Sequence, residues 1–538
     1  MTSVFSLSWR ERSYALSLLI LAVFAFFIYS FFSFLSLHKF SSPDETANHF
    51  FTQQFIKTSQ FKVAEPLNAS VENIIHPRSF GVSGQSLVPV SFLGLPLFYG
   101  FLGKIFGDWI IYFIGPLFAS LAVFFFYLLL KKIFSEKVAF YSALLLFLQP
   151  IFVFYAMRPF WHNGFFISLV IIAGYFLVNL LRSKKWHSYL LFGLILGLAL
   201  SVRTSEIIWL LPTVILVLVL NVKKIKYVNL LYTLLGLIVF LAPFFYYQNQ
   251  TYGHALASGY TTSIFDSGIA GGNTAMLTSL LGKLLPFGFQ PKAFFTNFFN
   301  YSFKLEFPWF GLAFFALLIF FKKYFSQKWT NRVFFYYLWF LGLSIWLMIY
   351  YGSFVFYEYL DKSAVLLGIS YARYWLPLYV FCLPLTLIFL KFILSKIWPK
   401  RLKLLFGLFF AVLVIISLFQ IILDPYYGLK TVKQEFLTQA QEKLNFVLKN
   451  TPENAIIIAG ANDKLYWPDR KVVGFTGDQV PDQVLRNLPI LYGQAPVYYE
   501  EILAGEAGRL NTHLKENGLV FGKISPNRDF YKITAISE

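Results

Sequence analysis

The segment Tyr14–Leu37 reads YALSLLILAVFAFFIYSFFSFLSL, and the polar stretch Ser41–Phe55, SSPDETANHFFTQQF, follows it almost at once. The first segment carries no charge and is longer than the ~20 residues that a helix needs to cross a hydrocarbon core. It is also too long for a signal-peptide core and lacks a small-residue cleavage site, so we expect a retained membrane helix. The polar stretch, with the acid pair Asp44 and Glu45, would then begin at a membrane surface.

The acid pair has two interpretations. Carboxylates at a membrane surface are costly unless they bind a cation, pair with a base or take a proton in chemistry. Pro43, Asp44 and Glu45 also have the composition of a first helical turn, where acids are favourable. Position alone leaves both open.

The composition decides the class of protein. The chain has 538 residues, of which 57% are hydrophobic and 13% charged, with a mean hydropathy of +0.62. Soluble domains have about 25% charged residues, so we expect a polytopic α-helical membrane protein. The single cysteine, Cys382, lies in an apolar run, which excludes internal disulfides and cysteine-based metal clusters.

The charges are unevenly distributed. Residues 430–538 carry 13 Lys and Arg and 13 Asp and Glu, so the whole net charge of +19 belongs to residues 1–429. The excess is too scattered for a nucleic-acid site, and it lies in short links between apolar runs. This is the positive-inside pattern, and it predicts that these links are cytoplasmic.

About eleven spans fit this pattern without conflict. They lie near 14–37, 108–130, 138–157, 164–181, 187–202, 206–222, 227–247, 307–321, 333–354, 372–396 and 402–423. The run Val88–Phe106 would reverse the sides of the basic links after it. Because it contains Pro89, Pro96 and three glycines, we expect it to be re-entrant or interfacial.

This topology places the outer loops at 38–107, 158–163, 203–205, 248–306 and 355–371, and the tail from about 424. These loops and the adjoining helix ends hold nearly all the unusual polar residues, which suggests one outward-facing site at the membrane surface. Besides the acid pair they include His49, His76, Arg78, Arg158, His162, Asn163, Arg203, Glu206, His254, Asp266, Glu358, Asp361 and Lys362. Taken singly, each Arg or His also fits headgroup anchoring by snorkelling.

Two outer segments have their own character. The first half of 248–306 is rich in Gly, Thr, Ser and Asn without a strand–loop–helix context, so we expect a mobile loop over the site, not a phosphate loop. In the tail, an amphipathic helix over Thr431–Leu448 precedes AIIIAG, KVVGF, APVYYE and GLVFGKI, which are typical of short strands. We expect a transmembrane domain over 1–425 and a small extracytoplasmic α/β domain over 426–538.

An acid pair after the first helix, an extended outer loop, many helices and an outer tail together resemble the GT-C superfamily of membrane glycosyltransferases, which use polyprenyl-phosphate-linked sugars. DETANHF is similar to the acid-pair motif of the protein O-mannosyltransferase and lipid A aminoarabinose transferase branches. HPRSF followed by LVPVSFLGLPLFYGFLGKIFG resembles the interfacial stretch that comes next in such enzymes. ARYWLPLY, with Arg373-Tyr374 and Pro377, is similar to their late Arg-Tyr-x-x-Pro pattern.

Two features depart from the family pattern. Family members often carry a second acid after an Arg at the outer end of the third helix, where this chain has Arg158-Pro-Phe-Trp-His162-Asn163 and no carboxylate. The Trp-Trp-Asp cluster of oligosaccharyltransferases is absent. The first departure puts in doubt a mechanism that needs an acid at that place, and the second counts against transfer of preassembled glycans to asparagine.

The resemblance implies Asp44 as the general base, and Glu45 would then orient the acceptor or a basic partner. Arg373 and Arg203 are candidates for binding the donor phosphate because they lie at the outer ends of helices. One carboxylate would deprotonate the acceptor hydroxyl, and guanidinium groups would stabilise the leaving phosphate. The further acceptor or loop candidates are His49, His76, Arg78, Arg158, His162 and His254. No cofactor is required, and a divalent metal, for which Glu45 and His254 are the candidates, is left open.

The expected function is therefore inverting transfer of a sugar from a polyprenyl-phosphate donor at the outer face of the cell membrane. The acceptor hydroxyl belongs to a lipid, a polysaccharide or a protein, and the partners are these molecules and membrane lipids, without nucleic acid. The alternatives are a transporter or flippase for a lipid-linked glycan and a non-catalytic glycolipid-binding protein. A transporter would place charges at mid-membrane and show inverted repeats, neither of which the sequence has.

Overall fold

The structure is a computed structural model that describes residues 9–35, 39–260, 285, 287–325, 332–355, 365–368, 370–397, 399–424, 428–431, 438–477 and 479–536. The chain divides into two compact units. The helical unit comprises Met1–Leu35, Trp109–Pro243 and Gly271–Val432, and the mixed unit comprises Ser36–Asp108, Phe244–Ala270 and Lys433–Glu538. Each is described by itself.

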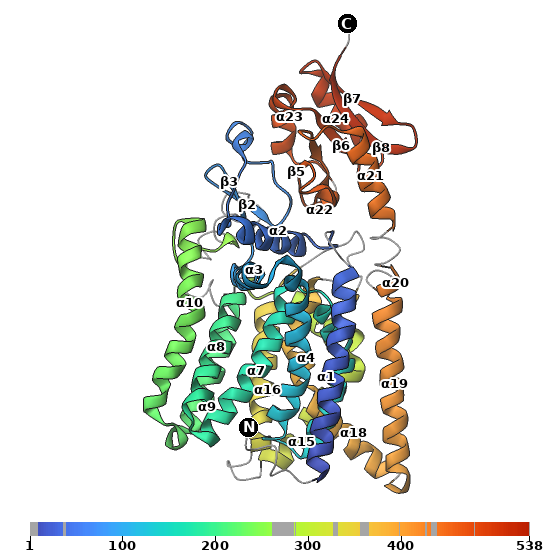
Figure 1. Cartoon of the computed structure of the whole chain (residues 1–538). Coiled ribbons are helices and arrows are strands. Elements are labelled where there is room, and N and C mark those ends of the chain that lie inside the picture. Colours follow the sequence, from blue (N-terminus) through green and yellow to red (C-terminus); the bar gives the residue numbers. More distant parts are fainter. Residues whose placement is uncertain are drawn as a thin grey trace. The chain divides into compact units, whose positions relative to one another are not determined.

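The helical unit is a bundle of apolar helices (Figure 1). Its described helices are α1 (Trp9–Leu35), α4 (Ile111–Leu130), α5 (Glu136–Leu148), α6 (Pro150–Ala156), α7 (His162–Ser183), α8 (Trp186–Val202), α9 (Ile207–Leu220), most of α10 (Leu230–Tyr252), α14 (Pro291–Phe298), α15 (Leu312–Phe325), α16 (Arg332–Gly352), α17 (Leu376–Phe381), α18 (Leu383–Ile397), α19 (Leu402–Leu423) and α20 (Leu429–Thr431). Backbone groups in hydrocarbon must bond within their own segment, which explains why the long apolar runs are helical.

Among the described residues, six helices are long and apolar enough to cross a membrane, and ten such units result if each bent helix pair is one span. The polytopic helical class is thus confirmed. The sequence counts 187–202 and 206–222 as two spans, and the structure has two helices there, α8 and α9, which meet at a bend of 117°. The total of eleven stays a prediction.

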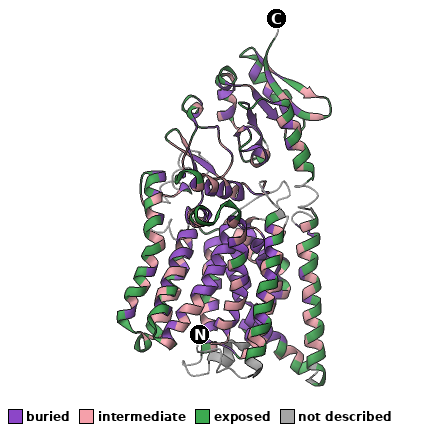
Figure 2. Ribbon diagram, in the orientation of Figure 1, coloured by how far each residue is buried: buried purple, intermediate pink, exposed green. Residues whose placement is uncertain are grey.

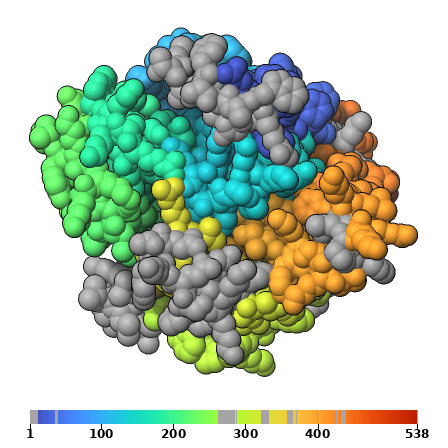
Figure 3. Space-filling view, turned by 90° about the horizontal axis from the view of Figure 1, so that it is seen from below, coloured from blue at the N-terminus to red at the C-terminus, as the bar shows by residue number. Residues whose placement is uncertain are grey.

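Burial separates central from peripheral helices (Figure 2). In the most apolar window of α7, 72% of the residues are buried inside the protein, against 11% in α19, so α19 presents most of its surface to lipid. Viewed from its end, the bundle has α8–α10 on one side and α18 and α19 on another, with the cyan and teal helices between them (Figure 3).

Glycines let α8 and α10 approach closely. A Cβ on Gly193 would lie 2.1 Å from the Thr233 carbonyl oxygen, and one on Gly236 would lie 2.6 Å from the Leu190 carbonyl oxygen. Small residues drive helix contact in membranes by allowing this backbone approach.

The predicted outer loop 248–306 is partly helical. Pro291–Phe298 forms α14, which continues as the π-helix η6 (Phe299–Lys304), and a second π-helix, η7 (Phe307–Gly311), leads into α15. The segments Pro291–Lys304 and Phe307–Ile319 meet at 91°. Its aromatic second half is thus helical at 291–304, which the sequence did not indicate because Phe, Asn and Lys have no strong helical periodicity there, and the outer loop 248–306 stays a prediction. Residues 261–284, most of the predicted mobile part, lie outside the described residues.

The mixed unit contains residues 38–107, which the sequence predicts to be the first outer loop. Here α2 (Pro43–Thr58) and α3 (Gly94–Phe106) flank a three-stranded antiparallel sheet in the order β1-β3-β2, formed by β1 (Val63–Ala64), β3 (Ser86–Pro89) and β2 (Phe80–Ser83). With 13 residues, α3 is about 20 Å long and too short for a core of about 30 Å. Its length agrees with the expectation that Val88–Phe106 does not span.

The C-terminal segment forms a five-stranded sheet in the order β5-β4-β6-β8-β7. The strands are β4 (Ile456–Ile458), β5 (Lys471–Val473), β6 (Val497–Glu500), β7 (Leu519–Ser525) and β8 (Arg528–Ala535), and the helices are α21 (Ala440–Asn450), α22 (Asp463–Tyr466), α23 (Asp482–Gln494) and α24 (Glu506–Lys515). The four predicted strands are present, β8 was missed, and the predicted helix 431–448 is present from Ala440, with 432–437 outside the described residues.

The first outer loop completes the core of this sheet. Ile457 packs on one face with Phe51 and Phe80, and its neighbours Ile456 and Ile458 pack on the other with residues Val71–Ile75. His76 also forms a parallel bridge with Val473 at the β5 edge. The contacts thus group the first outer loop with the C-terminal segment, whereas the predicted boundary at 425/426 treats them separately and stays a prediction.

Arg470 ties α21 to this sheet. Its buried guanidinium donates to the Thr451 hydroxyl at 2.9 Å, the Thr451 carbonyl at 2.8 Å, the Leu448 carbonyl at 3.2 Å and the Asp469 carbonyl at 2.7 Å. The carbonyls of Leu448 and Thr451 lie at the C-terminal end of α21, where carbonyl groups have no partner within the helix.

We predict that Arg470→Met lowers the free energy of unfolding of the mixed unit by about 3 kcal/mol, because it leaves these buried carbonyls without a donor. Hydrogen exchange of α21 and β5 in the purified full chain measures the change. Arg486→Met, at an arginine whose side chain is 65% exposed, is the matched control with little effect. Equal protection in the two variants would contradict the prediction.

Candidate functional site

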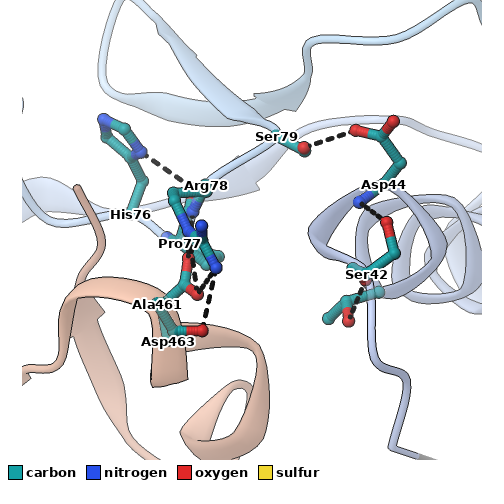
Figure 4. Close-up of polar contacts among 9 residues, drawn as sticks. Ser42, Asp44, His76, Pro77, Arg78, Ser79, Ala461 and Asp463 are labelled. Atoms are coloured by element: carbon teal, nitrogen blue, oxygen red, sulfur yellow. Dashed lines mark hydrogen bonds and ion pairs between the residues drawn. The ribbon is translucent and has the colours of Figure 1, made fainter. Parts of the chain in front are cut away.

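The acid pair begins α2, as the helix-start interpretation predicts. Ser42 is the N-cap, and its hydroxyl accepts a hydrogen bond from the Asp44 backbone N–H at 3.2 Å. Pro43 occupies the first turn, where its missing N–H costs nothing. The start of α2 therefore fixes the backbone of both acids (Figure 4).

Asp44 and Glu45 differ in exposure. Asp44 is half-buried, and the Ser79 hydroxyl donates to its Oδ1 at 2.6 Å. Glu45 is only 3% exposed. Asp44 is thus the acid of the pair that an approaching molecule can reach more easily.

Ser79 holds an unusual backbone conformation. Its φ of 63° lies in the left-handed region, which a residue other than glycine adopts at a cost. The Val90 N–H donates to the Ser79 carbonyl at 3.1 Å, and the neighbouring Arg78 is bound on its other side. Such strain persists only where surrounding contacts fix it.

The next turn of α2 is buried and polar. Asn48 is fully buried, and its Oδ1 accepts from the Ser91 hydroxyl at 2.8 Å. His49 is 7% exposed, with its ring centroid 5.1 Å from that of Phe40. His49 therefore lies among packed side chains, one turn along from the acids.

Arg78 pairs with a carboxylate of the C-terminal segment. Its Nη2 lies 3.0 Å from Asp463 Oδ1, its Nε donates to the same carboxylate, and its backbone N–H donates to Oδ2 at 2.5 Å. Nearby, His76 Nδ1 lies 2.9 Å from the Pro77 carbonyl oxygen. Burial lowers the pKa of His76, against the opposing effects of the Pro77 carbonyl and the Asp463 charge.

The helical unit gathers a second polar group around Arg203. This arginine, 6% exposed, lies in the break between α8 and α9 and pairs with Glu206 at 2.7 Å. Its Nη1 donates to Asn163 Oδ1 at 3.0 Å, and the Tyr351 hydroxyl donates to Glu206 at 2.7 Å. The charge of Arg203 is thus balanced within the protein.

Arg373 lies between aromatic rings in the same unit. Its guanidinium carbon is 4.2 Å from the centroid of Trp161 and 5.2 Å from that of Tyr374. Arg203 approaches the same Tyr374 ring at 5.5 Å, and Tyr351 stacks on it with a centroid distance of 4.7 Å. Two guanidinium groups therefore share one tyrosine ring in an apolar bundle.

The remaining predicted residues are dispersed or undescribed. Arg158 lies over the Phe154 ring at 4.4 Å, and His162 is buried at the start of α7. His254 is exposed beyond α10, where its Nδ1 accepts from the Leu256 N–H at 3.1 Å. The residues outside the described ranges are Asp266, Glu358, Asp361 and Lys362.

A metal site finds no geometric support in the part of the chain that the structure describes. There, no three His, Cys, Asp or Glu side chains come close enough together to hold an ion. The metal alternative that involves Glu45 and His254 stays a prediction.

Several residues of these two groups were not predicted. They contact the predicted arginines or acids, and they are Ser79, Asp463, Trp161, Tyr351 and Tyr374. Tyr374 and Trp161 had a local signal, since each lies close in sequence to a predicted arginine. Asp463 had none, because it is 385 positions from Arg78.

Residues 89–247 match the family of dolichyl-phosphate-mannose-protein mannosyltransferases. A comparison with curated proteins found no similar sequence. Among solved structures, ArnT from Cupriavidus metallidurans bound to undecaprenyl phosphate is similar, with 9% identity and a TM-score of 0.53 over 97% of this chain and 98% of that one. Also similar is the oligosaccharyltransferase AglB from Archaeoglobus fulgidus in complex with an inhibitory peptide and a dolichol-phosphate, with 14% identity and a TM-score of 0.46 over 99% of this chain and 75% of that one.

The apolar spans make the chain an integral membrane protein. The likeness to ArnT extends over nearly the whole of both chains, and the match at 89–247 is to a family of mannosyltransferases. The chain therefore has the fold of ArnT, which agrees with the fold expected from the resemblance to the GT-C superfamily of membrane glycosyltransferases.

Proposed function

We propose that the protein transfers a sugar from a polyprenyl-phosphate donor to an acceptor hydroxyl at the extracytoplasmic face of the cell membrane, with inversion at the anomeric carbon. The acceptor oxygen forms the new bond to that carbon, and the bond to the phosphate oxygen breaks. The acceptor proton passes to Asp44, and polyprenyl phosphate leaves. The half-buried Asp44 carboxylate, held by Ser79 at the start of α2, is the observation that carries this proposal.

The fold supports a donor of this class. ArnT is described as bound to undecaprenyl phosphate, and the family matched at 89–247 is named for dolichyl-phosphate-mannose. Undecaprenyl phosphate and dolichyl-phosphate-mannose both consist of a long isoprenoid chain joined to a phosphate. The apolar bundle of this protein, with 67 Phe in the sequence, offers the surface that such a chain requires.

The environments of the two acids favour Asp44 as the base. A general base must come within hydrogen-bond reach of the proton it takes. Asp44 is half-buried and Glu45 is 3% exposed, and this difference supports Asp44 as the acid that contacts the acceptor. Glu45 acts by orientation.

Arg373 is the better candidate for the donor phosphate. Arg203 pairs with Glu206 at 2.7 Å. The guanidinium of Arg373 lies over the rings of Trp161 and Tyr374. Stacking fixes the plane of a guanidinium, and a guanidinium held in this way can present its edge to two phosphate oxygens.

We predict that Asp44→Asn lowers turnover ~10²–10⁴-fold, because the amide cannot take the acceptor proton. The variant should still fold, since the oxygen of the new amide would accept the Ser79 hydrogen bond. Release of polyprenyl phosphate from a panel of radiolabelled polyprenyl-phosphate sugars measures turnover. If the wild-type protein releases polyprenyl phosphate from none of these donors, the proposed function is overturned.

Glu45→Gln is the matched comparison, with a smaller loss. If Asp44→Asn keeps more than about a tenth of the activity and Glu45→Gln does not, the roles are reversed. If both variants stay active, the acids only start the helix.

Arg373→Lys is expected to raise the donor KM substantially, because lysine keeps the charge but loses the fork and the ring stacking. Arg182→Lys, in the last turn of α7, is the control, about 30 Å along that helix from the turn beside Arg373. An unchanged donor KM and kcat in Arg373→Lys would show that Arg373 is only an interfacial anchor.

The proposed sidedness is tested by single cysteines in a Cys382→Ala background. A membrane-impermeant reagent added from outside should label positions 273 and 517 and leave position 224 unlabelled, as the basic links predict. Labelling at Lys224→Cys with protection at Asn517→Cys would reverse the topology.

A further inference from the structure

We propose that Asp463 of the C-terminal segment is a positioning residue for Asp44, acting through Arg78 and Ser79. The inference rests on the proposed role of Asp44 as the base. It assigns the C-terminal segment a part in the reaction, since a carboxylate of that segment fixes the backbone that carries the hydrogen-bond donor to the base. All four residues belong to the mixed unit.

The first step is the ion pair between Arg78 and the buried Asp463. The Asp463 side chain is fully buried, and it receives the Arg78 guanidinium and the Arg78 backbone N–H. Arg78 Nη2 also donates to the Ala461 carbonyl at 2.8 Å. A contact that includes the backbone N–H fixes the main chain of residue 78, not only its side chain.

The second step is the peptide that follows. Ser79 has a φ of 63°, a conformation that needs support from its neighbours. On the N-terminal side of Ser79, the backbone of Arg78 is held by Asp463. On the C-terminal side, the Val90 N–H donates to the Ser79 carbonyl. The Ser79 hydroxyl then points at Asp44 Oδ1 at 2.6 Å (Figure 4).

The C-terminal segment is shaped for this contact. A Cβ on Gly474 would lie 2.6 Å from Asp463 Oδ2 and 2.8 Å from the Arg78 backbone nitrogen. The Gly474 N–H also donates to the His76 carbonyl at 2.9 Å. Only glycine at this position admits the pair, so Gly474→Ala perturbs it without touching either charge.

The chemical consequence concerns the charged form of the base. A hydroxyl that donates to a carboxylate favours its ionised state. Loss of the Ser79 donor, or of the backbone that aims it, therefore disfavours the ionised base. Because a base works only when deprotonated, the acid limb of the rate–pH profile must move to higher pH.

The first test needs no substrate. Hydrogen exchange in the full-length protein should quicken at residues 76–80 and in the first turn of α2 in Asp463→Asn and Gly474→Ala. The central strands β4 and β6 should keep wild-type protection. Glu72→Gln is the matched control, because it breaks an exposed ion pair to Arg486 between the same two segments without touching Arg78. Exchange at 76–80 that equals the wild type in Asp463→Asn would overturn the inference.

The second test uses the polyprenyl-phosphate release assay. Ser79→Ala and Asp463→Asn should both shift the acid limb of kcat to higher pH, with the donor KM unchanged, whereas Glu72→Gln should not. A merely structural role would lower the amount of active protein and leave the limb in place, and that result would overturn the inference.

The failures of the two proposals are distinguishable. An active Asp44→Asn removes the proposed function, while the exchange experiment still reports the contact from Asp463 to Ser79. If Asp44→Asn is inactive but Ser79→Ala and Asp463→Asn both keep the wild-type acid limb, Asp44 remains the proposed base. The positioning role of Asp463 is then overturned.

Discussion

In hydrocarbon, a charge or a backbone polar group without a partner is costly, and the helical unit of this protein reflects that constraint. In the helical unit, Arg203 and Glu206 pair in the break between α8 and α9, and Gln149 donates to the fully buried Glu306 at 3.1 Å. Both acids lie where a helix is interrupted. These two interruptions therefore carry buried carboxylates, each with a partner inside the bundle.

The same constraint explains what the sequence could predict. Apolar runs of membrane length become helices with little choice, so α1, α4, α7 and α19 match their predicted positions. The strands around Ile456–Ile458 were also predictable, because a short β-branched run between turn residues has few alternatives. Local composition decides these elements.

Features that depend on distant pairing were not predictable. The burial of Val71, Ile74 and Ile75 against the C-terminal sheet and the Arg78–Asp463 pair both join segments far apart in sequence. The π-helical break that holds Glu306 was missed for another reason, since aromatic residues with no strong period suggested a loop. At the candidate site, the identity of the acids followed from sequence, but their partner Ser79 and its backbone conformation did not.

The two interpretations of the acid pair are compatible. Ser42 caps α2, and Asp44 stands in its first turn, so the helix-start role is present in the structure. A helix start also offers what a catalytic carboxylate needs, because the backbone there is fixed and the helix dipole favours a negative charge. Ser79 adds a donor from a different segment, at 2.6 Å, which a helix start alone does not require. Ser79 donates to this acid from the left-handed region, and the ion pair of Arg78 with the buried Asp463 supports that conformation. A first helical turn requires neither contact. The excess of fixed contacts around Asp44 is the physical argument that this end of α2 has a function besides starting the helix.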